Sequence, residues 1–293
     1  MATILSNIQD VCLEIGKPVP TSVVGSNDLT VLQLFGFMNR IGRDILREHD
    51  WQTLVKSYQF TSVGYTYTAT TTTGSNVITM ANTSGLTTDF EVSGDGIPTN
   101  TLITSVNPNV SVVMSNNATK SQTVTLTFKQ AFYPLPSNFG RFVDDTSYTP
   151  TNRWSMRVLT PQQWAMIKQG WATGTIPTLF RIIGNKVAIM PTLATGTIFT
   201  FEYITDDYVT DNLGVAKDKF TVDTDTCVFP DDLMIMGCKK LFTQQKGFDS
   251  TIIERDYMKL LSLAKSQDEP AQSINMGASA SPFYLNVPDG NFG

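Results

Sequence analysis

A long run of threonines with few charges is the feature that most constrains this chain. Residues 66–127 hold 17 threonines but only four charged side chains, whereas the other 231 of the 293 residues carry 43. Short β-prone runs recur through this segment between glycine and proline turn signals, as at residues 76–80 and 123–128. Threonine is well suited to exposed strand positions, where other proteins use lysine or glutamate. We therefore predict a small antiparallel β-sandwich inserted at residues 61–128.

Helical patterns flank this segment on both sides. Apolar residues at Ile4, Ile8, Val11 and Ile15 have the spacing of one helical face, and Gly16 stands where a C-terminal cap belongs. A second helix is expected from the cap residues 26–28 to Trp51. Two further helices are expected over residues 231–247 and 249–269, so that a helical hairpin lies near each end of the chain.

The elements together predict an α+β fold. Its main domain, residues 1–60 and 129–269, would be an antiparallel helical bundle built from the N- and C-terminal hairpins together with a mixed β region. That region would contain a helix over residues 161–169, started by a capping box at Thr160 and Gln163, a hairpin over 180–190 and a strand over 197–204. Residues 270–293 are expected to form an extended tail.

The chain offers little for catalysis. Its one histidine, His49, lies at the end of a charged helix, and Cys12, Cys227 and Cys238 lack the spacing of a zinc or disulfide framework. Asp223 and Asp225 begin like a calcium loop, but Val228 and Met234 stand where that loop needs glycine and glutamate. Adjacent acidic pairs occur at residues 144–145, 206–207 and 231–232, with nothing to single one out. We expect no enzyme activity, no metal and no cofactor.

The net charge and the absence of targeting signals indicate which kinds of partner and which compartment to expect. The net charge of −5 disfavours a protein that grips nucleic acid through its phosphates. The first residues show no secretory signal and no run is long enough for a membrane span, which favours a protein folded in the cytoplasm without a membrane partner. The tryptophans are expected to pack in cores more often than to stack on sugars or bases; they are Trp51, Trp154, Trp164 and Trp171.

The C-terminal tail carries large apolar side chains in an otherwise polar segment. They are Phe283, Tyr284, Leu285 and Phe292. A segment that cannot build its own core but keeps aromatic anchors is typical of one that orders on a partner. These four residues are the candidate partner-binding site, and an inert tail is the alternative.

Several short motifs resemble the head-to-tail adaptors of short-tailed bacteriophages, known as the tail tubular protein A or gatekeeper-ring family. At the N-terminal end the motif is Ile-Gly-Lys-Pro at residues 15–18, followed by a long helix ending at Trp51. Further along, Tyr-Pro-Leu-Pro-Ser-Asn-Phe stands at 133–139 and Leu-Thr-Pro-Gln-Gln-Trp at 159–164. Near the end, Phe-Pro-Asp-Asp at 229–232 leads into Lys-Lys-Leu-Phe at 239–242. The threonine-rich segment departs from this family pattern.

The resemblance implies a structural virion protein located at the head–tail junction and assembled in the host cytoplasm. Copies of the chain, commonly twelve, would form a ring that binds the portal protein on one side and a downstream tail or nozzle protein on the other. DNA would pass through the ring without specific binding, which suits a negative net charge. The tail residues Phe283 to Leu285 and Phe292 would then contact the portal.

Two other functions stay open. A host-surface or glycan-binding virion protein could use the threonine-rich insertion as its reader, although residues 66–127 contain only Tyr67 and Phe90 as aromatic side chains. A peptidoglycan-cleaving virion enzyme could use one of the acidic pairs.

Overall fold

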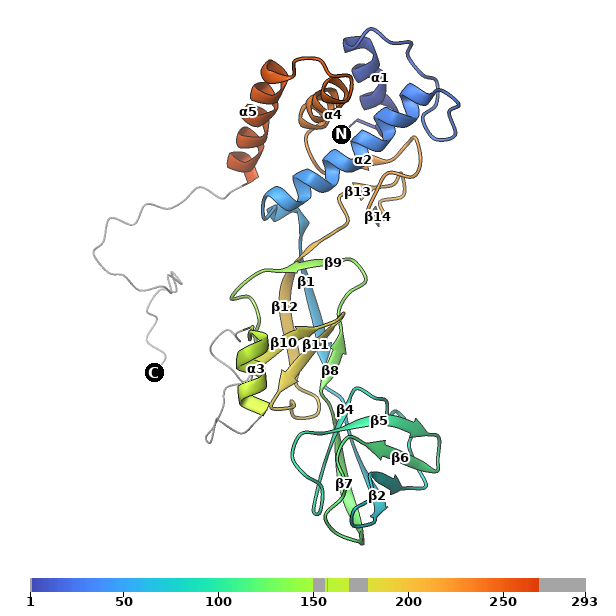
Figure 1. The fold of residues 1–293 in the computed structure, drawn as a ribbon, viewed down its shortest axis with the longest axis vertical. Coiled ribbons are helices and arrows are strands. Elements are labelled where there is room, and N and C mark those ends of the chain that lie inside the picture. Colours follow the sequence, from blue (N-terminus) through green and yellow to red (C-terminus); the bar gives the residue numbers. More distant parts are fainter. Residues whose placement is uncertain (1, 150–155, 157, 169–178, 269–293) are drawn as a thin grey trace, which may run out of the picture.

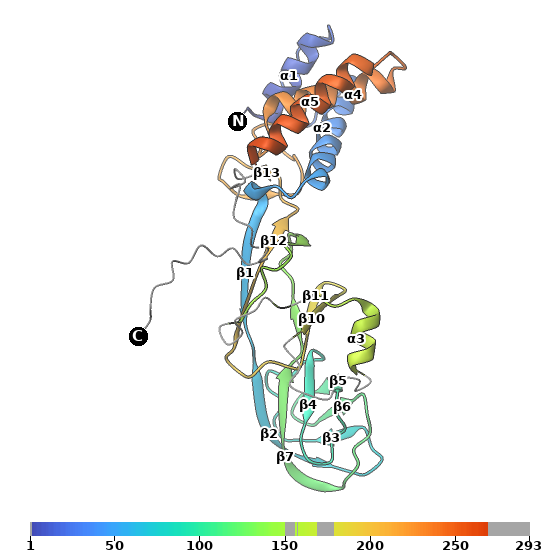
Figure 2. The same ribbon diagram turned by 90° about the vertical axis from the view of Figure 1, so that its left-hand side faces the viewer.

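The computed structural model describes residues 2–149, 156, 158–168 and 179–268. The molecule is elongated, with helices at one end, two small sheets in the middle and a β-barrel at the other end (Figures 1 and 2). The chain passes from the helical end through the middle into the barrel, and then returns.

Four helices form most of the helical end. They are α1 (Ile4–Glu14), α2 (Leu29–Glu48), α4 (Asp231–Gln245) and α5 (Thr251–Asp268). The Thr3 hydroxyl caps α1 by accepting a hydrogen bond from the Ser6 amide at 3.2 Å, and Asp28 caps α2 through the Thr30 amide at 2.8 Å. After α1, Gly16 adopts a φ of 65°, and the Lys17 amide donates to the Cys12 carbonyl at 2.8 Å, which closes the helix end. These helices lie where the apolar periodicity predicts them.

The core of this end is not made by helices alone. Three short strands pack beneath α2: β13 (Val209–Thr210), β14 (Ala216–Lys217) and β15 (Thr226–Cys227). Buried side chains from this region, including Tyr208, Phe220 and Phe229, belong to the same apolar cluster as Leu34 and Met38 of α2. The helices therefore depend on the strand region for part of their apolar contact.

The middle of the molecule consists of two three-stranded sheets. One has the order β1 (Val55–Thr61), β12 (Ile198–Thr205), β9 (Phe139–Phe142), and the other has the order β10 (Leu179–Ile183), β11 (Lys186–Met190), β8 (Phe132–Pro134). Aromatic rings fill the space between them: Phe60 stacks on Tyr133 and Phe199 with centroid distances of 4.1 and 4.9 Å. The helix α3 (Pro161–Lys168) lies beside the second sheet.

The threonine-rich segment closes into a six-stranded antiparallel barrel. Its strands are β2 (Gly64–Thr71), β3 (Val77–Thr79), β4 (Phe90–Ser93), β5 (Thr101–Asn107), β6 (Ser111–Met114) and β7 (Gln122–Gln130). Along β2, Thr66, Thr68 and Thr70 are exposed while Ala69 is buried, which is the alternation expected of a strand with one face in a core. Leu126 and Phe128 of β7 fill the barrel interior.

The predicted fold class is wrong in two respects. The described chain is mostly β, with 15 strands against five α-helices, so it is not a helical bundle carrying a β insertion. The inserted unit is a closed barrel and not a sandwich, because β7 pairs with β2 on one edge and β4 on the other. Alternation along a strand shows which face is buried but not which strands pair at the edges, and that pairing separates a barrel from a sandwich.

Gly42 of α2 lies directly against Tyr208, the residue before β13. A Cβ at this position would collide with the ring of Tyr208, which is fully buried and donates its hydroxyl to the Asn39 carbonyl at 3.1 Å. We expect Gly42→Ala to lower the free energy of unfolding by about 1–3 kcal/mol, because the held ring cannot move aside. Chemical denaturation measures this change.

Gly36, on the exposed side of the same helix, provides the matched control. A Cβ there meets nothing within 4 Å. Gly36→Ala should therefore raise the free energy of unfolding, by up to about 1 kcal/mol, through helix propensity alone. Equal effects of the two substitutions would contradict the close packing of Tyr208 on α2.

Candidate interaction surfaces

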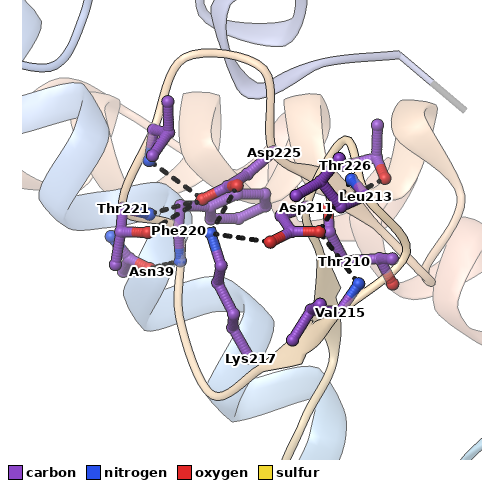
Figure 3. A network of polar contacts seen from close by, with 11 residues as sticks. Asn39, Thr210, Asp211, Leu213, Val215, Lys217, Phe220, Thr221, Asp225 and Thr226 are labelled. Atoms are coloured by element: carbon purple, nitrogen blue, oxygen red, sulfur yellow. Dashed lines mark hydrogen bonds and ion pairs between the residues drawn. The ribbon is translucent and has the colours of Figure 1, made fainter.

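A buried carboxylate organises the loop that follows β13 (Figure 3). Asp225 is fully buried and accepts hydrogen bonds from the backbone amides of Thr221 at 2.7 Å and Val222 at 2.9 Å. The ammonium group of Lys217 lies 2.9 Å from the other carboxylate oxygen. The charge of Asp225 is therefore compensated by several donors, as a buried charge requires.

Lys217 joins Asp225 to a second carboxylate. Its ammonium lies 3.9 Å from Asp211, and Asp211 itself accepts from the amides of Leu213 and Val215, both at 2.8 Å. These hydrogen bonds fold residues 211–215 into a tight turn whose two apolar side chains project away from the carboxylate. The turn is thus held by its own polar groups.

Further hydrogen bonds attach this loop to the helices. The Asn39 side chain of α2 accepts from the Phe220 amide at 2.8 Å. Asp223 accepts from the amides of Val23 at 3.1 Å and Val24 at 2.7 Å, in the connection between α1 and α2. The loop is therefore fixed to two separate segments of the helical end.

The fixed loop and the α1–α2 connection bound to it present apolar side chains to solvent. We call this the loop surface, and its residues are Val24, Leu213, Val215 and Val222. Leu213 is 83% exposed although its backbone is hydrogen-bonded in place. An apolar group held rigidly in water loses little further conformational entropy when a partner covers it.

A second set of exposed apolar side chains lies on α5 and the turn before it. We call it the helix surface, and its residues are Phe248, Ile252, Met258 and Leu263. Ile252 and Leu263 are 65% and 53% exposed and lie three helical turns apart on one face of α5, with the charged side chains of Arg255, Asp256 and Lys259 between them. Figure 1 shows α5 on the left of the helical end, and the β13–β14 region with the α1–α2 connection on the right.

Most residues that the sequence singled out for chemistry have structural roles. His49 is the C-terminal cap residue of α2, its ring lies edge-on to Trp51 at 5.1 Å, and its Nε2 is 3.6 Å from Asp268. The carboxylates of Asp223 and Asp225 accept hydrogen bonds from backbone amides. The described part of the chain holds no cluster of three or more potential metal ligands. The three cysteines are free and buried.

The acidic pairs also bind protein groups. Asp231, at the start of α4, accepts from the Ala2 amide at 3.0 Å, and Asp207 accepts from Asn138 at 2.7 Å. Burial and the neighbouring Asp207 raise the pKa of Asp206. The absence of enzyme activity is not tested by these contacts and stays a prediction.

Only some of the aromatic residues considered for packing or binding lie in the described part of the chain. Trp51 and Trp164 are buried, and Trp51 donates to the Ile45 carbonyl at 2.8 Å. In the barrel, Tyr65 is 5.6 Å from buried Phe90, and Tyr67 donates to the Ser84 carbonyl at 2.8 Å, so these rings are partly engaged within the barrel. Trp154, Trp171 and the four tail residues Phe283, Tyr284, Leu285 and Phe292 lie outside the described residues, and their roles stay predictions.

Sequence reasoning did not find the loop surface. The available signal was a set of isolated apolar residues, Leu213, Val215 and Val222, in a polar loop with four aspartates nearby at 211, 218, 223 and 225. That pattern does not reveal which aspartate is buried, because burial of Asp225 depends on Lys217 and on two amides that converge only in the folded loop.

Comparison with known families places the chain in a class. A family model described as SU10 adaptor protein matches residues 106–260, from β5 through most of α5. The match covers more than half of the 293 residues and includes the central-sheet strands β8 to β12, the loop residues Leu213, Val215 and Val222, and α4, but not β1. The chain belongs to the SU10 adaptor protein family. It is thus a bacteriophage structural adaptor and a component of the virion.

No curated protein matches the chain. Among the described residues, no helix has both the length and the apolar character needed to cross a bilayer. The family match supports the expected class of phage adaptor, but it does not distinguish short-tailed phages from others.

Asp225 should make the loop sensitive to acid. Burial alone would raise the pKa of Asp225, but hydrogen bonds from the Thr221 and Val222 amides and from Lys217 hold it below the usual 3.8. Because the pKa is lower in the folded state, the carboxylate stabilises the fold above the unfolded-state pKa. This contribution is lost as the pH falls through the folded-state pKa.

We expect Asp225→Asn to lower the free energy of unfolding at pH 7 by about 3 kcal/mol, because it leaves Lys217 without its buried partner. Between pH 7 and strongly acidic pH the variant should lose less stability than the wild type. Denaturation as a function of pH measures both effects. Asp218→Asn, at an exposed aspartate of the same loop, should change stability by less than about 0.5 kcal/mol; a comparable loss there would argue against a special role of Asp225.

Proposed function

We propose that this adaptor assembles with copies of itself into a closed ring at the head–tail junction, where it joins the portal to the tail and continues the DNA channel. The observation that carries this proposal is the two sets of exposed apolar side chains on the helical end. The loop surface and the helix surface lie on different sides of one chain and are made of different residues, so copies would contact each other head to tail. Such a heterologous contact forms a ring when its rotation closes.

Charge supports the DNA-channel part of the proposal. The chain has a net charge of −5, whereas a protein that retains DNA gathers lysine and arginine along its contact surface. A ring through which DNA moves benefits from weak attraction to phosphate. The ring, its copy number and its neighbours rest on the family resemblance together with these surfaces.

A phage that cannot make the protein tests the overall role. Its particles are expected to package DNA but to lose it or to fail in tail attachment. Complementation from a plasmid should restore infectious particles. Stable, tailed and infectious particles formed without the protein would refute the proposal.

Substitutions in the loop surface test the contact between copies. Leu213→Ser combined with Val215→Ser should weaken the copy–copy affinity by about 1–3 kcal/mol, or roughly 5- to 150-fold. The reason is that both apolar side chains are exposed in the single chain and would be buried against the neighbouring copy in the ring. The readout is the number of rings in electron micrographs of the protein mixed with purified portal. Val110→Ser, at an exposed valine of the barrel, is the matched control and should leave ring formation unchanged.

Mixing two variants makes this test sharper. A second variant with Ile252→Ser and Leu263→Ser should also fail to form rings, because it lacks the helix surface. In an equal mixture, the intact helix surface of the first variant can bind the intact loop surface of the second. Such a pair has no further intact surface, so the mixture should yield dimers but not rings, as measured by light scattering. Rings formed by either variant alone at the wild-type level would contradict the assignment of these surfaces.

A further inference from the structure

A small cavity lies where the barrel, the second central sheet and α3 meet. It is lined by Glu91 and Asn100 of the barrel, Ile189 and Met190 of β11, and Trp164 and Lys168 of α3, among others. Its volume is about 30 Å³. A water molecule needs roughly 10–15 Å³ measured in this way, so the cavity has room for one or two.

Trp164 brings an unsatisfied donor to this cavity. Trp164 is only 5% exposed, and among the described residues its buried indole Nε1 has no hydrogen-bond partner. The helix that carries it is held in place by a reciprocal capping box, in which Thr160 and Gln163 exchange hydrogen bonds of 3.0 and 3.3 Å. An indole N–H is a donor only, so pairing it needs an acceptor other than the described residues, and a water molecule in the cavity can supply one.

Glu91 brings spare acceptor capacity to the same cavity. Burial raises the pKa of its carboxyl group, while the Thr192 hydroxyl, the Asn100 amide and the charges of Lys129 and Lys168 act in the opposite direction. The carboxylate has about four lone-pair positions, and the two named hydrogen bonds leave some of them free. Other polar contacts cross this junction directly: Lys186 of β11 lies 2.6 Å from Asp89, and the Asn100 side chain donates to the Lys168 carbonyl at 3.4 Å.

We propose that this cavity is a water-binding site, in which an ordered water accepts from Trp164 Nε1 and donates to the Glu91 carboxylate. The site would complete the joint between the barrel and the rest of the molecule. It explains how a buried indole N–H and a partly buried carboxylate coexist on one cavity wall, and it is independent of the proposed function in phage assembly.

A double-mutant cycle of Trp164→Phe and Glu91→Gln tests the water bridge. With a bridging water, Trp164→Phe removes the water's donor and should raise the unfolding equilibrium constant about 3- to 10-fold at pH 7. The same substitution in the Glu91→Gln background should have a clearly smaller effect, because the water is already less firmly held. With an empty cavity, Trp164→Phe would still raise the unfolding constant through lost packing, but by the same factor in both Glu91 backgrounds. That result overturns the proposal.

Trp51→Phe is the matched control for the cycle. The Trp51 indole donates directly to the Ile45 carbonyl in the helical end, far along the molecule from the cavity. Trp51→Phe should also raise the unfolding constant, but by the same factor with and without Glu91→Gln. Coupling of similar size between Trp51 and Glu91 would show that the cycle does not report on the cavity.

A direct measurement complements the cycle. The indole N–H resonance of Trp164, identified as the one lost in Trp164→Phe, should show a nuclear Overhauser effect to a long-lived water in the intact protein. The effect should weaken or vanish in Glu91→Gln. An indole N–H with no contact to water, or with a protein acceptor in an experimental structure, would refute the site.

Discussion

The pairing of β1 with β12 is the constraint on which the rest of the structure depends. The two strands are hydrogen-bonded in register from Val55 with Ile204 to Thr61 with Ile198. At one end, Ile204 belongs to the core of the helices, and further along, Phe199 and Phe201 belong to the aromatic core of the central sheets. A ladder of this length spans on the order of 20 Å, so it separates the helical end from the barrel while joining the core of the helices to the core of the central sheets.

Because of this separation, the helical end and the barrel are each stabilised by their own set of contacts. The exposed apolar surfaces on the helical end are supported by contacts that lie within that end: Tyr208 against Gly42, and Asp225 against Lys217. The barrel is joined to the central sheets by a different set of contacts, including Lys186 with Asp89. A change in the barrel therefore leaves the loop surface and helix surface intact, which is why a barrel substitution serves as a control for assembly.

The sequence predicted local elements better than it predicted how they associate. Helices α1, α2, α4 and α5 were found because their apolar residues repeat with the helical period and because Thr3 and Asp28 provide caps. The fold class was wrong because the edges of a sheet leave no periodic signal. The double pairing of β7 that closes the barrel joins residues 53 positions apart, as with Thr70 and Thr123, and 38 positions apart, as with Glu91 and Lys129. The loop surface was missed for a related reason, since the burial of Asp225 arises only when Lys217, Thr221 and Val222 converge on it.

The four charges of the threonine-rich segment show why the segment needs so few. Asp89 pairs with Lys186 of the central sheet at 2.6 Å, and Asp95 pairs with Lys120 across the barrel at the same distance. Glu91 faces the junction cavity. Each charge thus has a partner or a place at the joint, while exposed threonines such as Thr66, Thr68 and Thr125 supply the polar outer face. A surface of hydroxyl groups stays hydrated without a strong field, and with three acidic residues and one lysine the segment contributes −2 to the net charge of −5.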